Sequence, residues 1–251
     1  MCYKYPEGES SFALRGVSFT LEAGERVALM GANGSGKTTF VRCLNGLLKP
    51  ISGDVCVDGM TTHDEKRMYD IRRSVGMVFQ NPDNQIVATT VVREIAFGLE
   101  NLGIPVDVMH ERVEEALGRF HLEDYRDSPP HFLSGGERQR LAFAAVYVMR
   151  PLYLVLDEPT SLLDPRGREE VLRMVEREAE ENQMGILLVT QYPEETLAFD
   201  RLVIMDAGEI VLEGPPRAVF QHEEDLGRLG LSIPVEITLG KWVPGWDADQ
   251  D

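Results

Sequence analysis

Short apolar runs alternate with longer amphipathic segments along most of the chain. The apolar runs predict strands at residues 17–21, 26–30, 55–57, 75–79, 152–156, 186–190, 202–205 and 210–212. The amphipathic segments predict helices at residues 37–48, 92–102, 106–120, 135–149, 165–182 and 193–199. This alternation predicts an α/β fold with a largely parallel central sheet. The two early strands, joined by a turn at residues 22–25, predict an added antiparallel β element.

The composition narrows the class of protein. The chain has 25 Lys and Arg against 42 Asp and Glu, a formal net charge of −17. Because nucleic-acid phosphates are bound by clustered Lys and Arg, this balance argues against a nucleic-acid-coating protein. No apolar run approaches the roughly 20 residues that a membrane-spanning helix needs, and residues 1–10 lack the apolar stretch of a signal peptide. Three Cys residues without metal-ligand spacing indicate a reducing, cytosolic compartment.

Residues 31–38 form a glycine-rich segment between a predicted strand and a predicted helix. Their sequence, Gly-Ala-Asn-Gly-Ser-Gly-Lys-Thr, fits the phosphate-loop pattern G-x-x-x-x-G-K-[ST] in the context that the pattern requires. Glycines let backbone N–H groups converge on phosphate oxygens, and the helix N-terminus adds its positive dipole end. Lys37 is expected to contact the β- and γ-phosphates, and Thr38 to offer its hydroxyl to Mg²⁺. The predicted ATP-binding residues of this segment are Asn33, Gly34, Ser35, Gly36, Lys37, Thr38 and Thr39.

The apolar strand predicted at residues 152–156 is followed by two carboxylates. Asp157 is expected to hold Mg²⁺ as the second half of a nucleotide site. Glu158, the next residue, points differently and is expected to orient and activate a water molecule against the γ-phosphate. The two segments together predict a site for a nucleoside triphosphate and its metal ion.

A third motif makes a family resemblance specific. Residues 133–137 read Leu-Ser-Gly-Gly-Glu and open another predicted helix, with Ser134 as a good N-cap. This motif, with its order and spacing relative to the two segments above, resembles the signature motif of the ATP-binding cassette (ABC) ATPases. The resemblance implies a P-loop NTPase core with a mainly parallel sheet, an antiparallel β subdomain and a helical subdomain, which together make the ABC nucleotide-binding domain. It implies an ATPase domain at residues 1–220, with the helical subdomain at about 82–150, and a short C-terminal extension at 221–251.

The resemblance also implies roles for further residues. Gln80 resembles the Q-loop glutamine, which contacts Mg²⁺ or water, and Asp164 resembles the D-loop aspartate, which reaches across a dimer. Tyr5 resembles the aromatic residue that stacks on adenine, with packing at a strand edge as the alternative. In this family two cassettes associate head to tail and bind ATP and Mg²⁺ between them. A nucleotide held by the partner is therefore expected to meet the signature residues Ser134, Gly135, Gly136 and Glu137.

Two features depart from the family pattern. Gln191 stands where the family usually has a switch histidine. A glutamine amide can donate a hydrogen bond to the γ-phosphate but cannot become cationic. Gln191 is thus a candidate catalytic residue that either slows hydrolysis or substitutes adequately. The chain also holds only part of the strand that normally precedes the adenine-stacking residue.

The segment after Gln80 indicates the subgroup. Residues 81–87, Asn-Pro-Asp-Asn-Gln-Ile-Val, and the amphipathic segment 92–101 resemble the ATPases of energy-coupling-factor (ECF) importers, which include cobalt and nickel uptake systems. The resemblance implies a peripheral protein at the cytoplasmic face of the cell membrane. Asp83 and Glu94 are candidate contacts for basic residues of the membrane partner, unless they belong to a solvated helix face. The expected partners are a second ABC ATPase subunit, identical or related, a transmembrane coupling subunit and a substrate-binding membrane subunit, with no nucleic acid.

Three alternatives have weaker support in the sequence. A soluble cassette ATPase that acts on DNA or ribosomes tends to carry tandem cassettes, long coiled coils or basic arms, which this sequence does not show. The ATPase of another ABC importer or exporter is disfavoured by residues 81–87. A slow or degenerate ATP-binding regulatory subunit is opposed by Lys37, Asp157 and Glu158, but Gln191 favours it.

Overall fold

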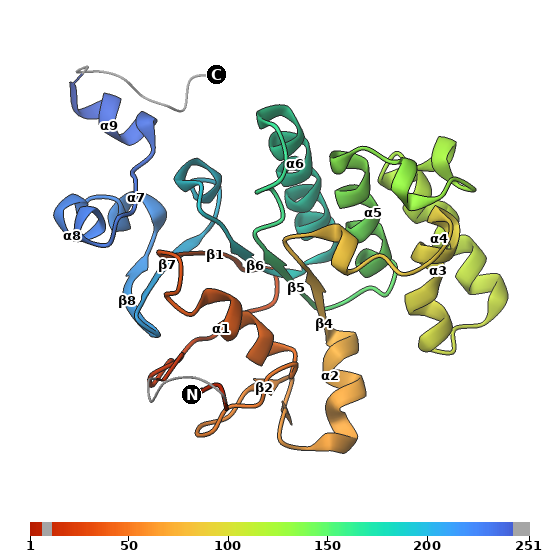
Figure 1. The fold of residues 1–251 in the computed structure, drawn as a ribbon, viewed down its shortest axis with the longest axis horizontal. Helices are drawn as coiled ribbons and strands as arrows, with labels where there is room; N and C mark the ends of the chain where they lie inside the picture. Colours follow the sequence, from red (N-terminus) through yellow and green to blue (C-terminus); the bar gives the residue numbers. More distant parts are fainter. Residues whose placement is uncertain (7–11, 243–251) are drawn as a thin grey trace.

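A computed structural model describes residues 1–6 and 12–242 of the chain, and its centre is a six-stranded sheet (Figure 1). The strand order is β4-β5-β6-β1-β7-β8. The strands from β4 to β7 are parallel, and β8 pairs antiparallel with β7. Their bounds are β1 Arg26–Met30, β4 Val75–Val78, β5 Tyr153–Asp157, β6 Gly185–Val189, β7 Arg201–Asp206 and β8 Glu209–Gly214. The predicted α/β fold with a mainly parallel sheet is confirmed.

Helices cover both faces of this sheet because its strands are apolar on both sides. Successive strand residues point to opposite faces, so Val27 and Leu29 of β1 join one buried cluster while Ala28 and Met30 join the other. Helices α1 (Lys37–Leu44) and α2 (Met68–Ser74) pack on the first face. The opposite face carries α5 (Gly135–Tyr147) and α6 (Pro165–Asn182).

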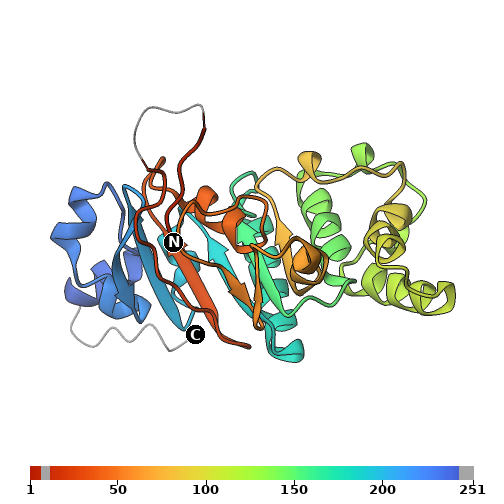
Figure 2. The same cartoon turned by 90° about the horizontal axis from the view of Figure 1, so that it is seen from below.

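A helical layer extends the molecule beyond β4. Helices α3 (Val91–Asn101) and α4 (Val106–Arg119) pack against α5, and Figure 2 shows them gathered at one end of the molecule. Between β8 and residue 242 the chain forms three short helices, α7 (Pro216–Val219), α8 (Glu223–Arg228) and α9 (Val235–Trp242). In the described part of the chain, no helix is long and apolar enough to span a membrane.

Several element predictions are wrong in detail. Residues 17–21 form no strand, and the small antiparallel sheet consists of β2 (Cys56–Val57) and β3 (Met60–Thr61). The apolar residues of 17–21 do pack on the core, but the Val17 amide donates to the Met1 carbonyl rather than to a strand ladder. The predicted helix at 193–199 is a short 3-10 turn, Pro193–Thr196, and α2 was not predicted.

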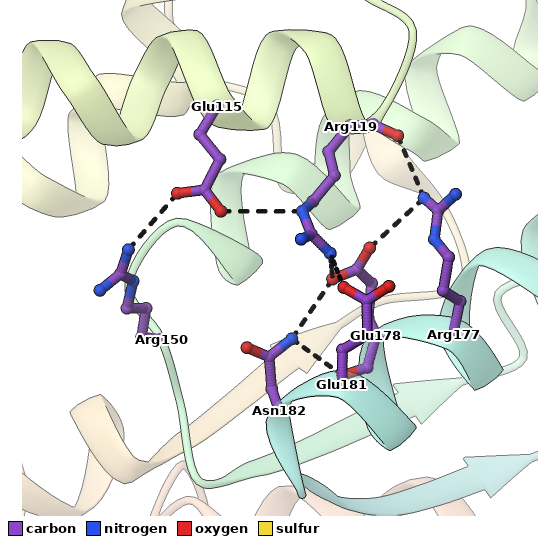
Figure 3. Close-up of polar contacts among 7 residues, drawn as sticks. All are labelled: Glu115, Arg119, Arg150, Arg177, Glu178, Glu181 and Asn182. Carbon is purple, nitrogen blue, oxygen red and sulfur yellow. Dashed lines mark hydrogen bonds and ion pairs between the residues drawn. The ribbon is translucent and has the colours of Figure 1, made fainter.

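A cluster of ion pairs fastens α4 to α6 (Figure 3). Nη1 of Arg119, the last residue of α4, donates to Oε2 of Glu178 and to Oε2 of Glu181, both at 2.6 Å. The Glu178 side chain is only 4% exposed, and its carboxylate also accepts from Arg177 and Asn182 at 3.4 Å. The hydrogen bonds to Glu178 and then to Glu181 raise the pKa of Arg119. The cluster therefore ties the helical layer to a helix of the core.

Arg119→Met is expected to lower the free energy of unfolding by about 2–4 kcal/mol, because it leaves the buried Glu178 carboxylate with weaker partners. Urea unfolding followed by circular dichroism measures this loss. Arg173→Met is the matched control, because it removes an exposed pair with Glu169 that contributes less than about 1 kcal/mol. Adding Glu178→Leu to Arg119→Met should recover most of the loss. Equal, small effects of the two arginine substitutions would contradict the assignment.

Candidate functional site

Three glycines shape the loop between β1 and α1. Gly31 has φ +158, and a Cβ there would lie 2.3 Å from the carbonyl oxygen of Met205, so no larger residue fits. Gly36 caps α1 with φ +105, a left-handed conformation that favours glycine. Gly34 also has a positive φ of +84, and no atom lies within 4 Å of the position of its missing Cβ. The loop is thus rigidly placed at its ends and open in its middle.

Lys37 is the first residue of α1, directly after this loop, and its side chain is buried, with 5% exposure. Its Nζ donates to the carbonyls of Gly31 at 2.7 Å and Ala32 at 3.1 Å. Burial lowers the pKa of Lys37, and the charges of Glu158 and Asp157 oppose that shift. Ser35 Oγ is buried without a hydrogen-bond partner among the described residues. An ammonium group and an unpaired buried hydroxyl in one glycine-rich loop fit a phosphate group.

Asp157 ends β5 directly beside the loop. Its carboxylate is buried and accepts a long hydrogen bond from Thr38 Oγ1, at 3.5 Å. Burial is the main cause that raises the pKa of Asp157, followed by the charge of Glu158, while Thr38, Arg42 and Lys37 act in the opposite direction. A hydroxyl and a carboxylate are hard oxygen donors of the kind that Mg²⁺ binds. The residues predicted to hold the metal therefore fit it chemically.

Glu158 lies at a sharp turn and meets two side-chain amides. Gln80 Nε2 donates to its Oε2 at 2.9 Å, and Gln191 Nε2 donates to Oε1 and Oε2 at 2.9 and 2.8 Å. These residues follow β4, β5 and β6, so the parallel strands deliver all of them to one edge of the sheet. Glu158 has φ +51, a left-handed conformation that costs a non-glycine residue about 1–3 kcal/mol. The structure thus brings the three predicted catalytic residues together around one carboxylate.

Tyr5 lies close to the phosphate loop at the N-terminal end of the chain. Its hydroxyl forms a 3.0 Å hydrogen bond with Thr39 Oγ1, and its ring packs edge-on against Tyr3. The side chain is 41% exposed. Tyr5 is thus placed next to α1 with much of its ring accessible, as a stacking role requires.

The signature residues lie at the start of α5, which packs on the opposite face of the sheet from α1. Ser134 caps α5 in a capping box, in which its hydroxyl accepts from the Glu137 amide and the Glu137 carboxylate accepts from the Ser134 amide. No atom lies within 4 Å of the position that a Cβ would take on Gly135 or Gly136. Asp164 caps α6 by accepting from the Gly167 amide at 2.7 Å. These residues therefore form a second, separate and open surface.

The structure corrects one surface prediction. The Glu94 carboxylate is buried, with 4% exposure, and accepts hydrogen bonds from the amides of Val87 at 2.9 Å and Ala88 at 2.6 Å. It fixes the loop before α3 and does not face a partner. Asp83 is exposed and pairs with Arg138 at 3.1 Å, so it keeps a position on the surface.

Sequence reasoning missed the groups that shape the turn at Glu158. The Ser161 hydroxyl donates to the Glu158 carbonyl at 3.0 Å, and the Glu158 amide donates to the Val189 carbonyl at 3.0 Å. A serine four residues after the end of a strand is a common turn residue, and this was the available signal. The left-handed backbone at Glu158 has no signal in the sequence.

Comparison with known proteins gives consistent matches. The family described as "ABC transporter" matches residues 14–161. The energy-coupling factor transporter ATP-binding protein EcfA1 of Caldanaerobacter subterraneus subsp. tengcongensis is 45% identical over 233 residues, covering 93% of this chain and 84% of the relative. The EcfA1 proteins of Clostridium novyi and Bacillus subtilis are 47% and 44% identical, covering 92% and 95% of this chain and 84% and 85% of the relatives.

Solved structures agree with these matches. The structure of cbiO1 from Clostridium perfringens, described as part of the ABC transporter complex cbiONQ, superposes with a TM-score of 0.81 at 36% identity and covers 96% of both chains. The ATP-binding cassette MJ0796, in a dimeric post-hydrolysis state bound to ADP and Pi, superposes with a TM-score of 0.78 at 29% identity. The superposition covers 86% of this chain and 96% of the MJ0796 chain.

Proposed function

The chain belongs to the ABC transporter family, and from that premise we propose that it is the ATPase subunit that powers an ECF importer of a micronutrient. The micronutrient is a vitamin or a transition metal ion such as cobalt or nickel. The importer assignment is supported by the EcfA1 relatives, and the observation that carries the ATPase activity is the meeting of Gln80, Glu158 and Gln191. It supports a chain built to cleave ATP as well as to bind it.

ATP binding rests on the phosphate loop and on Tyr5. The Lys37 ammonium is buried against two carbonyls, so exchanging those neutral acceptors for phosphate oxygens strengthens its hydrogen bonds. Helix α1 begins at Lys37, directly after this loop, so its first N–H groups and the positive end of its dipole lie next to the place where phosphate is proposed to bind. The exposed ring of Tyr5 offers a face on which adenine can stack. The residues proposed to bind ATP are Tyr5, Asn33, Gly34, Ser35, Gly36, Lys37, Thr38 and Thr39.

Thr38 and Asp157, with Gln80, are proposed to hold Mg²⁺. When bound, this ion supplies charge neutralisation for the phosphate oxygens. Burial is the main cause that raises the pKa of Asp157, because it disfavours the charged carboxylate. A bound cation would stabilise that charged form. Lys37 is proposed to add a further positive charge beside the phosphates.

Glu158 is proposed to accept the proton of the attacking water. Two amides hold its carboxylate, and amides cannot take its place as a base. The water then attacks the γ-phosphoryl group while Lys37 and the backbone N–H groups stabilise the negative charge. Most of the catalysis is expected to come from positioning and electrostatics.

The signature residues are proposed to complete the binding site of a nucleotide that a second cassette holds. Ser134, Gly135, Gly136 and Glu137 lie at the start of α5, on the opposite face of the sheet from α1, which supports a role at a site on another subunit. Asp164, at the start of α6, is proposed to contact that subunit. ATP between the two cassettes then favours closure, and hydrolysis reverses it.

The remaining partners are proposed to be a transmembrane coupling subunit and a substrate-binding membrane subunit, with this chain bound at the cytoplasmic face of the membrane. Purification of the tagged chain from native membranes tests this assignment. We expect a second cassette and two kinds of membrane protein to co-purify. Recovery of the intact chain with nucleic acid or ribosomes, and without membrane proteins, would contradict the importer assignment.

Substitutions at Gln191 distinguish an active ATPase subunit from a slow, regulatory one. Because its amide donates to Glu158, Gln191→Ala is expected to lower the single-turnover hydrolysis rate by roughly 10- to 100-fold, the value of a hydrogen bond to a charged group. Gln191→His is expected to stay within about threefold of the original rate. Rapid-quench measurement with radiolabelled ATP gives both rates. A large gain on introducing histidine would instead identify a chain that hydrolyses ATP slowly.

A further inference from the structure

The loop that follows β6 buries a carboxyl group for which the proposed mechanism has no role. Glu195 is 9% exposed, and Thr190, five residues earlier, is 1% exposed. Burial raises the pKa of Glu195, while the Thr190 and Thr160 hydroxyls and the charge of Arg168 lower it. Burying a carboxyl group is costly without partners. Its partners therefore indicate what it stabilises.

Thr190 links this carboxyl group to the backbone on both sides of Gln191. Its Oγ1 donates to Glu195 Oε2 at 2.5 Å and accepts from the Tyr192 amide at 3.0 Å. A hydroxyl group has one proton. Because the Tyr192 amide donates to the Thr190 oxygen, the Thr190 hydroxyl proton is available for the hydrogen bond to the Glu195 carboxylate. Glu195 thereby orients a hydroxyl that closes the turn around Gln191.

A second contact fixes the residue after Gln191. The Arg168 guanidinium lies 3.7 Å from the centre of the Tyr192 ring, and Arg168 Nε donates to the Leu163 carbonyl at 3.1 Å. This stacking ties Tyr192 to the start of α6. The backbone of Gln191 is therefore held from both sides, although the Gln191 side chain itself is exposed.

We propose that Thr190 and Glu195 are positioning residues for ATP hydrolysis: through the Thr190 hydroxyl they fix the loop that directs the Gln191 amide to Glu158. The inference rests on the proposed function, since it concerns the same hydrolysis step. Neither residue belongs to the phosphate loop, and the hydrogen bonds of the Thr190 hydroxyl lead to the backbone beside Gln191. A misplacement of a supporting group costs rate without costing ATP affinity.

Substitutions at Glu195 and Thr190 of the full-length chain separate this role from a general effect on folding. Glu195→Leu and Thr190→Val are expected to lower kcat by roughly 10- to 100-fold, with KM for ATP within about twofold. Glu195→Gln and Thr190→Ser keep a hydrogen-bonding group and are expected to restore kcat to within about threefold. Glu194→Leu is the matched control, because Glu194 is exposed one residue earlier, and it should leave kcat unchanged.

A double-mutant cycle with Gln191→Ala gives the deciding result. If Glu195 acts through Gln191, then Glu195→Leu should cause no further loss of kcat in the Gln191→Ala background. Loss by the same factor in both backgrounds overturns the inference, as does an unchanged kcat in the Glu195→Leu single variant. Thermal unfolding of each variant shows whether a loss of kcat comes from misfolding. If Glu195→Leu misfolds, the same cycle with Thr190→Val gives the deciding result.

The same assay distinguishes failure of the inference from failure of the proposed function. The unsubstituted chain and Glu158→Gln are measured alongside the cycle. Absence of ATP hydrolysis by the unsubstituted chain assembled with its second cassette, or full activity of Glu158→Gln in the same assembly, contradicts the proposed function. If hydrolysis depends on Glu158 but the effects of the substitutions at Gln191 and Glu195 are additive, only the positioning role is contradicted.

Discussion

Replacing Glu158 by glutamine is expected to lower the single-turnover rate of ATP hydrolysis by about 10²- to 10⁴-fold, the contribution of a general base. The amide keeps the shape of the side chain but cannot accept a proton from water. ATP binding should persist, because the phosphate loop and Lys37 remain unchanged. Rapid quench with radiolabelled ATP measures the rate, and equilibrium binding of a fluorescent ATP analogue measures the affinity.

Glu194→Gln is the matched control for this substitution. It makes the same chemical change at an exposed carboxylate that lies outside the cluster around Glu158. Its hydrolysis rate should stay within about threefold of that of the unsubstituted chain. A Glu158→Gln variant that cleaves ATP as fast as this control would contradict the role of Glu158.

Replacing Lys37 by methionine is expected to weaken ATP binding by roughly 10- to 150-fold, because a buried charge-assisted contact to phosphate is lost. Methionine fills similar space, so the loop should keep its shape. Isothermal titration calorimetry with Mg·ATP measures the change in Kd.

Lys49→Met is the control for the Lys37 substitution. Lys49 is a partly exposed lysine that pairs with Glu65 at 2.8 Å on the surface. Its removal should change the affinity for ATP by less than about twofold. Equal weakening by the two lysine substitutions would indicate a general charge effect on this acidic chain and would contradict a specific contact from Lys37.

The sheet and the placement of the site follow from local patterns in the sequence. The phosphate loop needs only a strand before it and a helix after it, and both are present as β1 and α1. The carboxyl ends of parallel strands meet at one edge, so residues that follow β4, β5 and β6 come together. For this reason the grouping of Gln80, Glu158 and Gln191 could be expected from their positions after strands.

Features that depend on partners distant in sequence were harder to predict. Val17, Phe19 and Leu21 pack on the core, but apolar packing alone does not supply a neighbouring strand. Glu94 has the charge of a surface residue, yet the bend before α3 points two backbone amides at it. The hydrogen bonds from Gln191 to Glu158 depend on the left-handed turn at Glu158, which no residue pattern encodes.

The nucleotide that the Glu158→Gln variant retains after incubation with Mg·ATP tests the central claim most directly. The chain is separated from free nucleotide after a time in which the unsubstituted chain completes one turnover, and the bound nucleotide is identified by chromatography. Our account predicts bound ATP on Glu158→Gln, because the phosphate loop binds and the base is missing. Bound ADP on this variant, formed at the rate of the unsubstituted chain, would show that the base lies elsewhere.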